Sequence, residues 1–433
     1  MRRVHCFHYI ILLALAFATP ALADEATKDA PLAVDAPAKV VESPKPEVPE
    51  PSISDMDIAD IRAAAETGDP KAQYYLGLAY HNGKETFKSD VEAARWWRNS
   101  AEQGYADAEF ILGVMYDTGT GVSSNASKAV EWWKKAAEQG VAKAQYNLGL
   151  SYASGKGTKQ NDAQAVEWYR KAAEQGVAAA QCNLAAAYFS GTGIEKDFAE
   201  AFTWFSKAAK QDNVQAQYSL GVIYEHGTGT SKNLGEAAKW YTKAAEHGHA
   251  QAQYIMGLWY DSGTGVELNH GEALKWYRKA AEQGVAGAEY NLATMYADGV
   301  EVKRNHAEAL KWYRKAAEQN DVNALYNLGV IYERGIGVEK DEGKAIEWYT
   351  KAVEQGSARA EYNLATMYYN GTGVKRDVVL AYAYLNLAVA KGYKEASVMR
   401  DTIEKSMTKE EIVEAQYLSR EGHFPRVWSV QMF

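Results

Sequence analysis

Apolar and polar positions repeat along this chain with a period of 36 residues. In each period an alanine is followed four residues later by leucine or methionine, and after four more residues by tyrosine. These spacings place all three side chains on one face of a helix. The pattern therefore predicts an amphipathic helix at the start of each of nine repeats. The alanines are Ala72, Ala108, Ala144, Ala180, Ala216, Ala252, Ala288, Ala324 and Ala360, and the same step reaches Ala396.

Each repeat continues through a glycine turn into a second helix. A glycine ends the first helix in every repeat, from Gly83 to Gly371, because glycine tolerates the left-handed backbone that closes a helix. The second helix begins at a Ser, Asn or Asp that caps its free N–H groups. Seven residues after the cap lies a tryptophan in eight repeats, and we expect this tryptophan column to pack between the helices. The tryptophan column is Trp96, Trp132, Trp168, Trp204, Trp240, Trp276, Trp312 and Trp348.

Helix, turn and cap signals agree in all nine repeats, and such agreement between levels identifies a fold class. We predict an all-α solenoid of nine 36-residue helix–turn–helix repeats with capping helices, because repeat arrays grow by stacking. The predicted parts are a signal peptide (1–23), a Pro/Ala/Glu-rich disordered linker (24–53), an N-terminal capping helix (54–68), nine repeats (69–394), a C-terminal capping helix pair (395–421) and an aromatic tail (422–433).

The first 23 residues have the features of an export signal. Arg2 and Arg3 precede an apolar stretch, and the small-residue sequence Ala-Leu-Ala ends at Ala23 before Asp24. The apolar stretch is short for a bilayer span, so cleavage is favoured over a retained anchor. We expect a periplasmic or secreted protein with no integral membrane span after cleavage.

Charge argues against two classes of partner. Cleavage after Ala23 would remove two of the 47 basic side chains and leave all 56 acidic ones. Nucleic acids and anionic lipid surfaces both attract an excess of basic groups, which this chain does not have. Cleavage would also leave Cys182 as the single cysteine, at a position that is tyrosine or phenylalanine in the other repeats. We therefore expect a buried apolar role for Cys182.

The repeated sequence resembles the Sel-one-like repeat (SLR) family, which is related to the tetratricopeptide repeats. One repeat runs AQYIMGLWYDSGTGVELNHGEALKWYRKAAEQG, residues 252–284, and similar segments cover nearly the whole mature chain. The resemblance implies a right-handed α–α superhelix whose concave surface binds protein partners. Exported bacterial relatives are linked to binding of host proteins, to virulence and to envelope signalling. A cysteine-rich branch resembles penicillin-binding and β-lactamase-like envelope hydrolases, and this remains an alternative although that branch carries a disulfide in each repeat.

The first helices carry the pattern that most resembles a binding site. Asparagine precedes the leucine in five repeats, and the position four residues later is apolar and large in six. We expect both sets to line the concave face, where amides would bond an extended peptide and apolar side chains would anchor it. Trp259 is the leading candidate, because Ala, Ser, Met or Ile fill its position elsewhere. Alternatively, the asparagines bond between neighbouring repeats. The candidates are Asn147, Asn183, Asn291, Asn327 and Asn363, with Met115, Ile223, Trp259, Met295, Ile331 and Met367.

The sequence shows no catalytic or metal-binding set. It has no Ser/His/Asp or Cys/His grouping, and His247 and His249 have no further ligands near them in the sequence. The sequence therefore predicts a non-enzymatic scaffold that binds a protein or peptide and needs no cofactor. It leaves the oligomeric state open.

Overall fold

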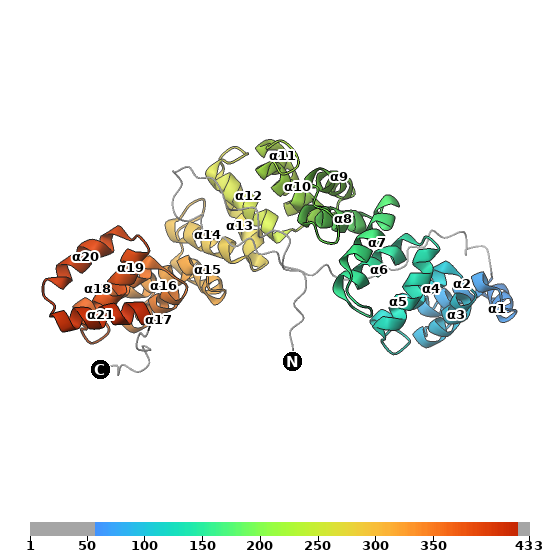
Figure 1. The fold of residues 1–433 in the computed structure, drawn as a ribbon, viewed down its shortest axis with the longest axis horizontal. Coiled ribbons are helices and arrows are strands. Elements are labelled where there is room, and N and C mark those ends of the chain that lie inside the picture. Colours follow the sequence, from blue (N-terminus) through green and yellow to red (C-terminus); the bar gives the residue numbers. More distant parts are fainter. Residues whose placement is uncertain (1–56, 423–433) are drawn as a thin grey trace. The chain divides into compact units, whose positions relative to one another are not determined.

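The computed structural model describes residues 57–422, and this part of the chain consists of helices without a strand (Figure 1). The predicted all-α repeat fold is confirmed. The predicted signal peptide, the linker and residues 423–433 of the tail lie outside the described residues. The helices are α1 (Ile58–Glu66), α2 (Pro70–Asn82), α3 (Asp90–Glu102), α4 (Ala106–Thr118), α5 (Ala126–Glu138), α6 (Ala142–Ser154), α7 (Asp162–Glu174), α8 (Ala178–Ser190), α9 (Phe198–Ala209), α10 (Val214–His226), α11 (Leu234–Glu246), α12 (Ala250–Ser262), α13 (His270–Glu282), α14 (Ala286–Asp298), α15 (His306–Glu318), α16 (Val322–Arg334), α17 (Glu342–Glu354), α18 (Ala358–Asn370), α19 (Val378–Ala390), α20 (Lys394–Glu404) and α21 (Lys409–Glu421).

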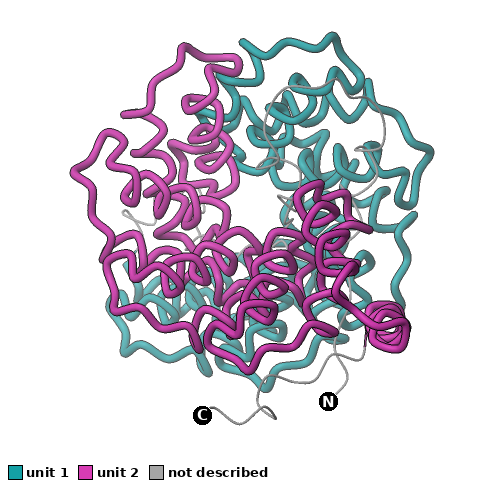
Figure 2. The backbone as a smooth tube through the Cα atoms, turned by 90° about the vertical axis from the view of Figure 1, so that its left-hand side faces the viewer, with its two compact units in different colours: residues 1–243 teal, residues 244–433 magenta. Residues whose placement is uncertain are grey.

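The chain divides into two compact units within α11, unit 1 up to Lys243 and unit 2 from Ala244 (Figure 2). Within each unit an even-numbered first helix packs on the second helix of its own repeat, and that second helix packs on the next first helix. Each unit is therefore a solenoid in which a repeat contacts its neighbours in the stack. Helix α1 packs on α2 before the first repeat, and α20 and α21 both pack on α19 after the last.

The predicted turn and cap residues explain where the helices end. All nine glycines that follow the first helices are left-handed, with φ between 69° and 78°. The N-caps of the second helices accept backbone N–H groups, as Asn125 does from Lys128 at 3.0 Å. These local bonds satisfy groups that helix termini would otherwise leave unpaired. The sequence therefore sets each helix end independently of the rest of the stack.

The second glycine of the turn is also left-handed, with φ of 66° at Gly121, and it has a further role, which is close packing against the preceding repeat. A Cβ on Gly121 would lie 2.1 Å from the carbonyl oxygen of Asp90, at the start of the preceding second helix. Two repeats have glutamate at this position, and Glu85 and Glu301 take the left-handed backbone, with φ of 57° and 53°. The turn geometry is thus kept even where glycine is absent.

The deepest part of the core lies beside the tryptophan column rather than in it. The residue that follows each tryptophan is buried in every repeat, whereas five of the eight tryptophans are only half-buried. Tyr349 is fully buried, and a Cβ on the facing Gly329 would lie 2.4 Å from its ring. Its neighbour Trp348 is half-buried, with the ammonium of Lys351 4.3 Å from the ring centroid. The residues of this aromatic slot are Trp97, Trp133, Tyr169, Phe205, Tyr241, Tyr277, Tyr313 and Tyr349, with Leu385 in the last repeat.

Candidate interaction surface

The first helices keep one stripe of side chains partly open to solvent. In α6 this stripe contains Lys143, Leu150 and Ser154, at spacings that place them on one helical face. The position of Leu150 is half-buried in all nine first helices, and six of its residues are leucine or valine. We call this set the aliphatic row. The aliphatic row is Leu78, Val114, Leu150, Ala186, Val222, Leu258, Thr294, Val330 and Thr366.

The predicted asparagines lie next to the aliphatic row but bond to the neighbouring repeat. The Asn363 amide donates to the Tyr349 hydroxyl at 2.9 Å, and this hydroxyl donates to the Glu333 carboxylate at 2.5 Å. One chain of bonds therefore joins α18, α17 and α16 across two repeats. The Asn183 amide lies near the hydroxyls of Tyr169 and Tyr146 in the preceding repeat, where it opposes the increase in their pKa that burial causes.

The same arrangement recurs at two more asparagines. The Asn291 amide lies near the Tyr277 hydroxyl, and the Asn327 amide lies near the hydroxyls of Tyr313 and Tyr290. Burial raises the pKa of the Tyr313 hydroxyl to about 12, so it is protonated at neutral pH and remains a hydrogen-bonding partner. Asn147 follows a repeat with Trp133 in the aromatic slot and is itself buried. The structure thus shows a hydrogen bond between repeats for Asn363, and it places three more asparagines near tyrosine hydroxyls of the preceding repeat.

The predicted apolar anchors point into the core. Met115, Ile223, Trp259, Met295, Ile331 and Met367 are each between 1% and 8% exposed. This burial leaves little side-chain surface for a partner to contact, even at Trp259, and corrects the expectation of an open apolar row at this position. The open apolar position is the residue just before it, such as Leu258 beside Trp259. Both positions follow the asparagine position by about one helical turn, one of them three residues later and the other four. Helical periodicity alone therefore does not say which of the two faces solvent.

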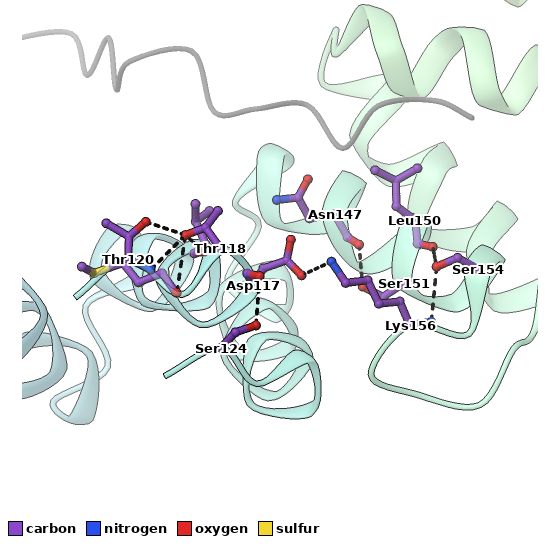
Figure 3. Close-up of polar contacts among 11 residues, drawn as sticks. Asp117, Thr118, Thr120, Ser124, Asn147, Leu150, Ser151, Ser154 and Lys156 are labelled. Atoms are coloured by element: carbon purple, nitrogen blue, oxygen red, sulfur yellow. Dashed lines mark hydrogen bonds and ion pairs between the residues drawn. The ribbon is translucent and has the colours of Figure 1, made fainter. Parts of the chain in front are cut away.

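Polar contacts border the stripe where the first helices end in unit 1 (Figure 3). The Lys156 ammonium lies 2.5 Å from the Asp117 carboxylate, which joins the turn of the third repeat to the end of α4. The Ser154 hydroxyl donates to the Leu150 carbonyl at 2.8 Å and accepts the Lys156 N–H at 3.3 Å. These contacts hold the polar edge of the surface at a defined position beside Leu150.

The described residues contain neither a cluster of groups placed for metal binding nor a helix that could cross a membrane. In residues 57–422 no cluster of three His, Cys, Asp or Glu side chains is placed to hold a metal ion. Burial raises the pKa of the Cys182 thiol to about 12, so this cysteine stays protonated. None of the helices in the described part has the length and apolar character needed to cross a bilayer.

Comparison with known proteins identifies the repeat. The family model described as the Sel1 repeat matches nine consecutive segments between residues 70 and 393. A crystal structure of a protective antigen present in uropathogenic Escherichia coli strains, which displays an SLR fold, is 35% identical, covers 84% of this chain and 94% of its own, and has a TM-score of 0.53.

A second similar structure is that of a Sel1 repeat protein from Oxalobacter formigenes. It is 33% identical, covers 72% of this chain and 90% of its own, and has a TM-score of 0.55. No curated protein matches the chain. The repeats, the helix pairs and both relatives agree, and the chain belongs to the Sel1 repeat family.

Proposed function

We propose that this chain is an exported scaffold that holds an extended segment of a partner protein on the first-helix stripe. The observation that carries the proposal is the aliphatic row, which offers a half-open leucine or valine in six of the nine repeats. An extended segment can place its own side chains against such regularly spaced contacts, as proteins do in other stacked-repeat arrays. The Sel1 repeat architecture itself is a scaffold generally used for protein–protein interaction.

Neighbouring polar groups fit the same role. In unit 1, Leu150 lies beside the Asp117–Lys156 pair and the Ser154 hydroxyl, so an apolar contact is bordered by charges and hydroxyls. Binding surfaces commonly combine an apolar centre with a polar rim. The comparisons offer no support for the envelope hydrolase alternative, and we therefore favour binding over catalysis.

Site-specific photo-crosslinking tests the binding surface. We expect a photo-reactive residue at Leu78 or Leu150 to give a discrete adduct in the native cell or in host secretions. Lys134 is the matched control, because it is exposed on α5, a second helix. We further expect Leu150→Asp to weaken binding of the captured partner by about 10-fold or more, since loss of a central apolar contact commonly has this effect.

The result at Lys134 distinguishes specific binding at the stripe from nonspecific binding elsewhere on the protein. Adducts of the same partner at Lys134 and Leu150, or full affinity in the Leu150→Asp protein, would rule out the stripe as the binding surface. Trp259→Ala is less informative, because Trp259 is 5% exposed and its loss would disturb packing as well as any contact.

Export is the second part of the proposal, and the relative from uropathogenic strains, described as a protective antigen, supports it. We expect the protein from the periplasm or the medium to begin at Asp24, as shown by its intact mass. The variant Ala23→Asp should block cleavage and leave a form that retains Met1, because signal cleavage needs a small residue at this place. Detection of only the full-length chain in the cytoplasm would contradict export.

A further inference from the structure

A row of buried side chains occupies the joints between successive repeats. We call the residue that directly follows each repeat alanine the joint position. None of its residues is more than 5% exposed, and eight of the nine are glutamine or glutamate. Buried polar groups need hydrogen-bond partners, so the bonds made here bear on how firmly the repeats hold together. The joint residues are Gln73, Glu109, Gln145, Gln181, Gln217, Gln253, Glu289, Leu325 and Glu361.

Glutamine closes the joint with two bonds. The Gln145 amide donates to the carbonyl of Ala137 in the last turn of the preceding helix at 3.1 Å. Its oxygen accepts from the Gln175 amide of its own repeat at 2.8 Å. The other four glutamines bond the carbonyl eight residues earlier in the same way, at 2.9 to 3.4 Å. The amide N–H therefore links each of these repeats to the helix before it.

Glutamate at the joint keeps the second bond but has no N–H for the first. Glu109 accepts from the Gln139 amide at 2.8 Å, and Glu289 accepts from Gln319 at 2.9 Å. Glu361 accepts from the Lys391 ammonium at 2.6 Å through Oε1, while its Oε2 is buried without a partner. An ionised carboxylate at this place also lies near the C-terminal end of a helix, where the carbonyls carry partial negative charge.

We propose that the three glutamate joints are closed by a proton. Protonated Glu109, Glu289 or Glu361 donates its O–H to the carbonyl that the glutamine N–H bonds in the other joints. The proton comes from solvent, and ionisation returns it there and leaves the bond unmade. By analogy with the glutamine joints, the acceptors are the carbonyls of Ala101, Ala281 and Val353. These joints are then tighter in acid than at neutral pH.

The charges around each glutamate allow this behaviour. Burial raises the pKa of Glu109 against the bond from Gln139 and the charge of Lys135, while Glu138 adds to the increase. A pKa that is higher in the folded than in the unfolded chain means that the folded state binds more protons between the two values. Stability is therefore present at low pH and lost as pH rises through this window.

The other two carboxyls behave alike. Burial raises the pKa of Glu289 against Gln319 and Lys315, with Glu318 and Asp321 adding to the increase. Burial also raises the pKa of Glu361 against its bond to Lys391. The Tyr384 hydroxyl is near Glu361 and has a raised pKa of its own, mainly from burial, so it stays neutral. At all three glutamates burial is the largest cause, and it outweighs the neighbouring groups that favour the ionised form.

Thermal unfolding of the full chain at two pH values tests the proposal. We expect Glu109→Gln with Glu289→Gln to raise Tm by about 3 °C at pH 7.5, because each glutamine supplies the missing N–H at all pH values. The gap should narrow toward pH 4.5, since burial raises the pKa of both wild-type carboxyls and so favours their protonated forms in acid. A gap that is equal at both pH values, or a lower Tm in the variant at pH 7.5, would overturn the proposal.

Two controls separate the hydrogen bond from removal of a charge. Glu289→Leu copies the native Leu325 joint and removes the charge without supplying a donor, so it should raise Tm less than Glu289→Gln alone. An equal rise in both variants would show that charge removal accounts for the effect and would also overturn the proposal. Glu131→Gln removes an exposed charge on α5 and should leave Tm unchanged at both pH values.

Discussion

Tyr349→Ala should lower the free energy of unfolding by about 3–5 kcal/mol, as large truncations in a packed core do. Tyr349 is fully buried, faces Gly329, and forms bonds to Glu333 and Asn363 that join three helices. Alanine would leave a cavity between two repeats and two polar groups without their shared partner. Urea unfolding followed by circular dichroism, together with hydrogen exchange across α16 to α18, measures the loss.

Trp348→Ala is the matched comparison, because the two residues are adjacent and differ in depth. Trp348 is half-buried and has the Lys351 ammonium over its ring, so we expect its loss to cost about 1–2 kcal/mol. Tyr349→Phe should lie between the wild type and the alanine variant, since it keeps the ring and removes the hydroxyl. A larger effect at Trp348 than at Tyr349 would show that the tryptophan column is the main core after all.

The difference in depth between Trp348 and Tyr349 shows how far the sequence alone can predict the core. Tryptophan recurs in eight repeats, and the following slot varies among Trp, Tyr, Phe and Leu. Because the tryptophan is nearly constant, the sequence places the tryptophan column between the helices and does not single out the following slot. In the structure the depth of the slot is set by the small residue opposite it, such as Gly329 beneath Tyr349. This pairing joins positions 20 residues apart, and helical periodicity alone does not show it.

The fold itself followed from the sequence because its signals are local. A glycine such as Gly155 and a cap such as Asn161 each act through bonds within a few residues, and nine repeats supply the same signals. The candidate surface was harder to predict because its orientation depends on packing. Leu258 and Trp259 are neighbours, yet one is half-open and the other is 5% exposed. The choice between them is made by the helices that pack on α12.

The role of the joint residues was not predicted from the sequence, for a related reason. Gln145 lies near the start of a helix, where polar side chains are common and usually solvated. Its role depends on the Ala137 carbonyl of the preceding helix and on Gln175 after the next one. When the bonds of the joints are compared, Glu289 stands where other joints have glutamine. The rest of its joint is the same, so the difference shows what the missing amide N–H does.

Gly157→Ala should destabilise unit 1 by more than about 2 kcal/mol, for two physical reasons. Gly157 has φ of 76°, and the left-handed backbone costs a non-glycine residue about 1–2 kcal/mol. In addition, the new Cβ would lie 2.3 Å from the carbonyl oxygen of Ala126 at the start of α5. Relief of this overlap requires the turn to move away from the preceding repeat, which opens the contact between α5 and α6.

Gly140→Ala isolates the first of these reasons, the cost of the left-handed backbone. Gly140 is also left-handed, with φ of 94°, but nothing lies within 4 Å of a Cβ placed there. Its substitution should cost about 1 kcal/mol, from the backbone alone. Urea midpoints of the two variants, measured side by side, give the difference that steric overlap contributes. Equal losses would mean that the turn moves freely, in which case the second glycine serves backbone conformation and not the packing of one repeat on the next.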